Sequence, residues 1–143
     1  MKELFTALQT RYDGSSGTAL KALAPTMVVG RANQNTTGEY ITLSQPAGTT
    51  DHTIGMSLGT SIGSQQENIQ ITFNVWTDNR SPQAGWKVVN AVKALYDNQI
   101  LSLSSSYEML HALRQSPGIQ IEEPDGKGWH IPVEYEYRIG RKI

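Results

Sequence analysis

The acidic side chains near the C-terminus are the first candidates for chemistry in this sequence. Glu134 and Glu136 lie in a segment that alternates apolar and polar residues, so a β-strand would place both on one face, about 7 Å apart. Two carboxylates at such a distance can act as a general acid and a general base. Arg138 follows on the same face, however, and a solvated row of alternating charge is the simpler interpretation.

Other patterns of catalytic or ligand-binding residues are missing from the sequence. His52, His111 and His130 lie in separate segments, without the HxxxH or HxH spacing that places two metal ligands on one element. No Gly-x-Ser-x-Gly elbow presents a nucleophilic serine, and the glycines of residues 55–63 lack the lysine and following helix of a phosphate loop. We therefore expect no catalytic, cofactor-binding or metal-binding residue.

Composition and charge narrow the class of protein. The chain has 143 residues with 12 basic and 13 acidic side chains, so no basic field attracts nucleic acid or an anionic membrane. Cysteine is absent, which excludes disulfides and thiolate metal sites. The sequence shows neither a signal peptide nor an apolar run long enough to span a membrane. These properties predict one soluble domain, residues 1–143, in the cytoplasm where it is made.

Residues 69–96 indicate the architecture that must position any site. Residues 69–76 alternate apolar and polar side chains, as a half-buried strand does, and the apolar side chains are expected to face a helix. Ser81 and Pro82 follow as an N-cap and a first helical residue. Apolar residues then recur at steps of three and four up to Tyr96, which predicts an amphipathic helix.

Shorter patterns predict the remaining elements. We expect helices at residues 1–12 and 18–24, and strands at residues 27–29, 39–44, 107–114, 119–122 and 129–139. Pro46 and Gly48 would end the second of these strands. In residues 107–114, Met109, His111 and Leu113 would share one face. The predicted fold class is α+β, with a mainly antiparallel sheet packed against an N-terminal helix and a central helix.

Residues 48–66 form a glycine-rich segment whose apolar residues recur at alternate positions. Asp51 carries its only formal charge. This pattern predicts an extended β-hairpin or loop arm, and sizeable exposed apolar patches mark contact sites. The candidates for a subunit interface are His52, Ile54, Met56, Leu58 and Ile62. The alternative is that these side chains cover the edge of the sheet.

The order of these elements resembles that of the tail-terminator, or tail-completion, proteins of long-tailed bacteriophages, over nearly the whole chain. In that family a strand resembling residues 70–76 precedes the main helix, and a strand resembling residues 129–135 ends the domain. The resemblance implies a small α+β structural protein rather than an enzyme, without a cofactor. It also implies a homo-oligomeric ring, typically a hexamer, that caps the tail tube and joins the head connector.

The resemblance further implies the partners and the location. The partners would be the tail tube protein, the head–tail connector or stopper protein and, in a contractile tail, the sheath. The ring would belong to the tail or neck of a virion assembled in the host cytoplasm, with DNA only passing through its lumen and no membrane contact. A ring with head-to-tail contacts needs two different patches on each subunit, which the arm and a sheet edge would supply.

The charged row receives a different role under this resemblance. Glu134, Glu136 and Arg138 become candidates for a ring contact or for the lumen wall, where acidic or neutral side chains would repel phosphates. Two alternatives stay open. One is a head-side connector or stopper subunit of the neck, and the other is a small hydrolytic enzyme that uses Glu134 and Glu136 or a histidine.

Overall fold

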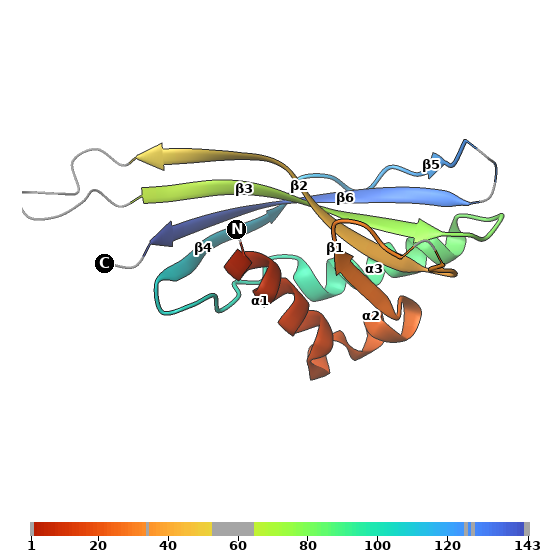
Figure 1. Ribbon diagram of the computed structural model, residues 1–143, viewed down its shortest axis with the longest axis horizontal. Helices are drawn as coiled ribbons and strands as arrows, with labels where there is room; N and C mark the ends of the chain where they lie inside the picture. Colours follow the sequence, from red (N-terminus) through yellow and green to blue (C-terminus); the bar gives the residue numbers. More distant parts are fainter. Residues whose placement is uncertain (1, 34, 53–64, 125, 127, 142–143) are drawn as a thin grey trace, which may run out of the picture.

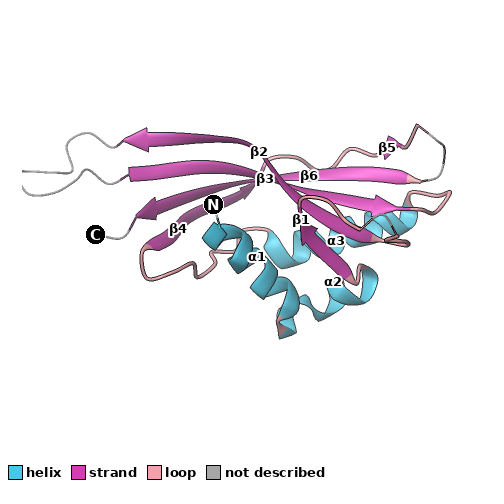
Figure 2. Cartoon of the chain, viewed as in Figure 1, coloured by secondary structure: helices cyan, strands magenta, loops and turns pink. Residues whose placement is uncertain are grey.

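The computed structural model describes residues 2–33, 35–52, 65–124, 126 and 128–141, and these form a sheet with helices on one face (Figures 1 and 2). Its helices are α1 (Lys2–Asp13), α2 (Thr18–Leu23) and α3 (Gln83–Tyr96), with a 3₁₀ turn, η1 (Ser15–Gly17). Its strands are β1 (Thr26–Val29), β2 (Tyr40–His52), β3 (Gln65–Thr77), β4 (Tyr107–Arg114), β5 (Ile121–Glu122) and β6 (Trp129–Arg141). The predicted α+β class, with an N-terminal and a central helix on a mostly antiparallel sheet, is confirmed.

The sheet has a different width at each end of its long strands. Its order is β1-β2-β3-β6-β4, and β5 pairs with β6. The parallel strand β1 borders β2 only as far as Leu43, and β5 pairs with the first two residues of β6. The antiparallel strand β4 borders the other half of β6, from Tyr135 to Arg141. We call the part with β1 and β5 the broad end, and the part with β4 and the tips of β2 and β3 the narrow end.

The hydrophobic core lies between the helices and one face of the sheet. The buried side chains of the long strands are Ile41, Leu43, Ile69, Ile71, Phe73, Val75, Ile131, Val133, Tyr135, Tyr137 and Ile139. The Phe73 ring centroid lies 4.8 Å from that of Tyr96 on α3 and 5.2 Å from that of Tyr135. Burying each large apolar side chain stabilises the fold by roughly 1.5–3 kcal/mol. The expectation that the apolar face of residues 69–76 meets a helix is therefore correct.

Strand β2 is much longer than its sequence pattern indicated. It continues past Pro46 and Gly48, which were expected to end it, and pairs with β3 up to His52 opposite Gln65. The register shifts between Ser44 and Ala47, so Pro46 lies in an irregularity of the ladder, where a missing N–H is tolerated. The described part of the predicted arm is thus an antiparallel strand pair that runs beyond the helices (Figure 1). Ile54, Met56, Leu58 and Ile62 lie outside the described residues.

Two further element boundaries, those of α3 and β5, differ from expectation. Helix α3 begins at Gln83, with Pro82 rather than Ser81 as the N-cap residue, although the Ser81 hydroxyl accepts the Gln83 N–H at 3.3 Å. Strand β5 covers Ile121–Glu122 and not residues 119–122, because only these two residues pair with β6. In each case sequence pattern located the element but not its limits.

The alternation expected within β4 was wrong. Between Met109 and His111 the pairing with β6 shifts by one residue, a β-bulge that turns the following side chains over. Ala112, and not Leu113, is therefore buried on the same face as Met109, while Leu113 is 43% exposed. The bulge places His111 and Leu113 on the face of the sheet opposite the helices.

Candidate functional site

The predicted charged row lies on the open face of the sheet, which the helices do not cover. Glu134, Glu136 and Arg138 alternate with buried residues of β6 and are each half-buried. Their Cα partners on β3 are Thr72, Gln70 and Asn68. On β4, the strand that pairs with the other edge of β6, Glu136 lies opposite Leu113 and Arg138 lies opposite His111. The two carboxylates therefore belong to a polar surface shared by three strands.

A shallow hollow of about 420 Å³ lies at the narrow end of this open face. It is lined by Gln66, Asn68, Leu110, His111, Glu136 and Arg138. Glu134 is not among the lining residues, so the hollow holds one carboxylate of the predicted pair. Within the described residues no group of three or more His, Asp or Glu side chains could hold a metal ion. The hollow is therefore lined by a mixture of amide, charged and apolar side chains.

The three histidines lie on three different strands of the sheet. His52, His111 and His130 lie on β2, β4 and β6. His111 is exposed, whereas His130 is half-buried and its burial lowers the pKa of the imidazole. The Nε2 atom of His130 lies 2.9 Å from Oδ1 of Asn74, an amide oxygen that can only accept, so Nε2 carries the proton. This histidine is engaged in holding the sheet.

An aromatic row crosses the open face at the broad end, and sequence reasoning missed it. The Trp76 ring stacks on the His130 ring with centroids 4.0 Å apart, and Tyr40 lies on the other side of Trp76 at 6.1 Å. The indole N–H of Trp76 donates to the Thr42 hydroxyl at 3.0 Å. These side chains occupy polar-face positions of three strands, and only the register of the strands shows that they are neighbours.

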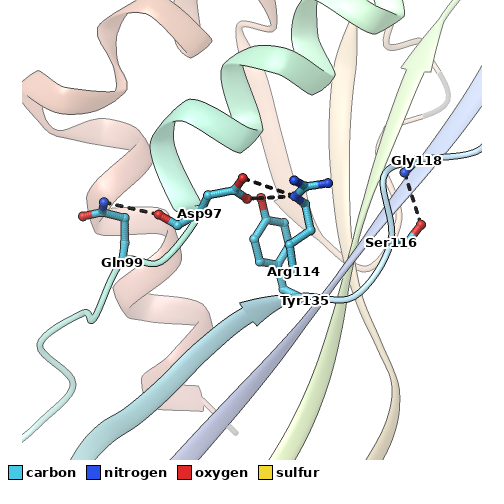
Figure 3. A network of polar contacts seen from close by, with 6 residues as sticks. All are labelled: Asp97, Gln99, Arg114, Ser116, Gly118 and Tyr135. Carbon is cyan, nitrogen blue, oxygen red and sulfur yellow. Dashed lines mark hydrogen bonds and ion pairs between the residues drawn. The ribbon is translucent and has the colours of Figure 1, made fainter.

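A polar cluster fixes β4 to the helix layer (Figure 3). Asp97, just after α3, accepts the Nε–H of Arg114 with both carboxylate oxygens, at 3.1 and 3.2 Å. Its Oδ1 also accepts the hydroxyl of Tyr135 at 2.5 Å. Burial and this hydrogen bond raise the pKa of Tyr135. One carboxylate thus joins the end of α3, the end of β4 and the middle of β6.

Two strand edges at the narrow end lack a neighbouring strand within the described part of the chain. One is the outer edge of β2 beyond Leu43, where β1 has ended. The other is the outer edge of β4, the last strand of the sheet order. Leu110 and Leu113 of β4 are each 43% exposed. Unpaired edges and exposed apolar side chains are features of surfaces that contact other chains.

Comparisons with known proteins relate the fold to a virus-like particle. No family model and no curated protein matches the sequence. A solved chain from the "Virion of native gene transfer agent (GTA) particle" has the same fold, with a TM-score of 0.67 and 14% identity over 96% of this chain and 94% of that one. A second solved structure, without a descriptive name, gives a TM-score of 0.57 and 12% identity over 99% and 95%. Among the described helices, none is long and apolar enough to cross a membrane.

Proposed function

We propose that this chain is a structural protein of a phage-like virion. In this proposal it assembles into an oligomeric ring, terminates or completes the tail tube, and joins the tail to the head connector. The observation that carries the proposal is the likeness to a chain of a gene transfer agent virion over almost the full length of both chains. A shared fold does not define a function, so the surfaces must supply the rest of the argument.

The narrow end has the two different edges that a head-to-tail ring requires. Its strands run in alternating directions in the order β2, β3, β6, β4. If β4 of one copy lies beside β2 of the next, with strands roughly parallel to the ring axis, the alternation continues across the junction. The two edges lie on opposite sides of one sheet (Figure 2). Each copy would then offer β4 to one neighbour and the tip of β2 to the other.

Charge favours the same junction. Residues 32–79, which include β2 and β3, carry four acidic side chains and neither lysine nor arginine. The part of β6 beside β4, Tyr135–Arg141, carries Arg138 and Arg141 against Glu136, a net formal charge of +1. Within β4, Glu108 and Arg114 cancel, and Arg114 is paired with Asp97. Opposite charges on the two sides of a contact orient the partners and disfavour wrong pairings. The junction would also cover Leu110 and Leu113.

The open sheet face suits a lumen wall. Its polar positions on β6 carry Glu134, Glu136 and Arg138, with a net formal charge of −1, and they lie beside amide and hydroxyl side chains of β3. A wall that does not neutralise phosphates gives DNA no counterion-release gain on contact. The face would therefore let DNA pass without binding it.

The test is electron microscopy of particles made without this protein, together with mass measurement of the purified chain. A terminator predicts closed rings and, when the protein is missing, tails of abnormal length that lack heads. A head-side connector or stopper predicts tails of normal length and heads that lose DNA or remain tailless. Normal tails joined to filled heads would contradict both roles. Restoring the wild-type gene is the control.

A further inference from the structure

A groove lies at the narrow end of the sheet, between β4 and the segment that joins α3 to β4. It has a volume of about 350 Å³ and is lined by Ile100, Leu101, Ser102, Leu103, Ser104, Tyr107, Glu108 and Met109. In Figure 1 the joining segment lies on the helix side of the sheet, at the end where the tips of β2 and β3 lie. The groove therefore runs along β4, the last strand of the sheet order.

Apolar side chains dominate the lining of this groove. Ile100 is 59% exposed, and Leu101, Leu103 and Tyr107 are only partly buried against the core. Among the lining residues only Glu108 carries a formal charge. Exposed apolar side chains that gather in one place are typical of a contact site for another protein segment.

Hydrogen bonds hold the segment that forms one wall of the groove. Asp97, at its start, accepts the Nε–H of Arg114 at the end of β4 (Figure 3). Further along, the backbone N–H of Leu101 donates to the sulfur of Met109 at 3.3 Å. The segment is thus fixed to β4 at both places. A surface that is ordered in advance loses less entropy when it binds a partner.

The strand register places the groove level with the end of β2. Glu108 of β4 and Gln66 of β3 are both Cα partners of Gly140, and Asp51 of β2 is the Cα partner of Gln66. Glu108 and Asp51 therefore lie at one level, on opposite sides of the sheet. A rotation about an axis roughly parallel to the strands keeps this level from one copy to the next. In the proposed ring, the chain that follows Asp51 in one copy therefore begins beside the groove of its neighbour.

The chain that follows β2 is as apolar as the groove. Residues 53–64 contain no charged side chain, and their large apolar residues are Ile54, Met56, Leu58 and Ile62. Strands β2 and β3 end at His52 and begin at Gln65, so this segment leaves and re-enters the described structure at the narrow end. Ile54 follows His52 by two residues, about 7 Å along a strand. It is therefore the apolar residue of the segment nearest to the groove of the neighbouring copy.

The groove and this segment also belong to the same side of the sheet. Met109 of β4 is the Cα partner of buried Ile139, which places it on the helix side. On β2, Gly48 is the Cα partner of buried Ile69 and belongs to the helix side as well. Ile54 lies an even number of residues after Gly48, so the two-residue period of a strand predicts the helix side for its side chain.

We infer that residues 53–64 of one copy bind in the groove of the next copy, with Ile54 packed against Leu103 and Tyr107. The inference rests on the proposed ring and adds a hydrophobic contact to the β4–β2 junction. A second copy is the fitting occupant because the register brings its uncharged, apolar segment to an apolar groove. Glu108 is exposed and stays in water at the rim of the contact.

A matched set of substitutions tests the contact in the full chain. Ile100→Asp places a carboxylate in the groove and should raise the dissociation constant of the assembly about tenfold or more, because the contact would bury an unpaired charge. Ile54→Asp should have the same effect from the other side. Ile119→Asp, at an isoleucine that is 64% exposed at the broad end, should assemble like the wild type. Sedimentation velocity measures association, and thermal unfolding shows that each variant is folded.

Engineered cysteines locate the contact independently, because the natural chain has none. Ser102 lines the groove and is exposed. Copies with Ser102→Cys, mixed with copies with Ile54→Cys and treated with a short bismaleimide, should give a covalent dimer that contains one copy of each. The double variant should give a ladder of covalent oligomers. Ile119→Cys in place of Ser102→Cys should give neither product above the background of a single variant.

The outcomes separate this contact from the ring itself. A wild-type ring, with Ile100→Asp and Ile54→Asp rings of equal stability and no cross-linked product, would overturn the contact and leave the ring standing. A cross-link confined to one chain would overturn a second copy as the occupant. Ile100→Asp rings that form normally but fail to bind tail tubes would overturn it too. A wild-type chain that remains monomeric, alone and with tail tubes, would overturn the ring and this contact together.

Discussion

The two faces of the sheet are held in place by different forces. On the helix-covered face, Phe73 and Tyr135 are fully buried, and their hydrophobic stabilisation depends on area rather than direction. On the open face, Trp76, Asn74 and His130 are aligned by hydrogen bonds and ring stacking, which depend on strand register. The covered face therefore determines whether the chain folds, while the open face is not covered by the helices.

The largest effect on stability should come from truncating a buried side chain on the covered face. Phe73→Ala should lower the free energy of unfolding by about 3–5 kcal/mol, because it removes a fully buried ring that contacts Tyr96 and Tyr135. Urea unfolding followed by tryptophan fluorescence measures this loss. Gln70→Ala, on the open face of the same strand, should change stability by less than about 0.5 kcal/mol. Equal losses in the two variants would remove the distinction between the faces.

A second pair of variants compares two neighbouring tyrosines of the covered face. Tyr135→Phe should cost about 1.5–3 kcal/mol, since it removes a hydrogen bond to the Asp97 carboxylate. Tyr137→Phe should be neutral or stabilising, because the buried Tyr137 hydroxyl has no hydrogen-bond partner among the described residues. Thermal and urea unfolding of both variants give the comparison. A larger loss for Tyr137→Phe would show that its hydroxyl has a partner in solution.

The open face should respond to pH through His130. Burial holds the pKa of this imidazole below its ordinary value of about 6.5, so the folded state favours the neutral ring. As the pH falls below about 6.5, the unfolded chain binds a proton that the folded chain resists, and stability decreases until the folded pKa is reached. Each unit of pKa displacement corresponds to about 1.4 kcal/mol. The wild type should lose more stability than His130→Gln between pH 7 and pH 5, measured by thermal unfolding. Parallel pH profiles would contradict this.

The smallest effect on stability should come from the charged row. Glu134→Gln combined with Glu136→Gln should change the free energy of unfolding by less than about 0.5 kcal/mol, since both side chains are half-buried on the open face. Reversing both charges to lysine should instead alter ring assembly or DNA delivery, measured by electron microscopy and by the yield of filled, tailed particles. Unchanged assembly and delivery after reversal would count against a role for this row at the lumen or ring contact.

Much of the fold followed from local pattern. The alternation in residues 69–76 and 129–139 predicted both long central strands and their buried faces, because a strand against a helix layer must be apolar at every second position. Helix α3 followed from its three- and four-residue steps. The sequence also predicted correctly that Glu134, Glu136 and Arg138 lie on one face, because this depends only on the two-residue period of a strand. Their function, and that of the interface residues predicted in the arm, stays a prediction.

The predictions were wrong where the shape or length of one strand depends on its pairing with another strand. Because of the bulge in β4, Ala112 is buried in the core and Leu113 is exposed. No residue type in β4 indicates that a bulge forms there. The irregularity at Pro46 let β2 continue, because β3 supplied a partner on its far side. These outcomes depend on pairing, which local sequence does not contain.

The sequence by itself determined the class of elements, the sides of the long strands that are buried, and the lack of a recognisable catalytic motif, because each of these depends on residue type and local period. Only the tertiary structure decided which side chains are neighbours. Strand register aligned Tyr40, Trp76 and His130, and chain folding brought Asp97 to Arg114 and Tyr135. A surface that contacts another chain consists of residues that are distant in sequence, so only the tertiary structure defines it.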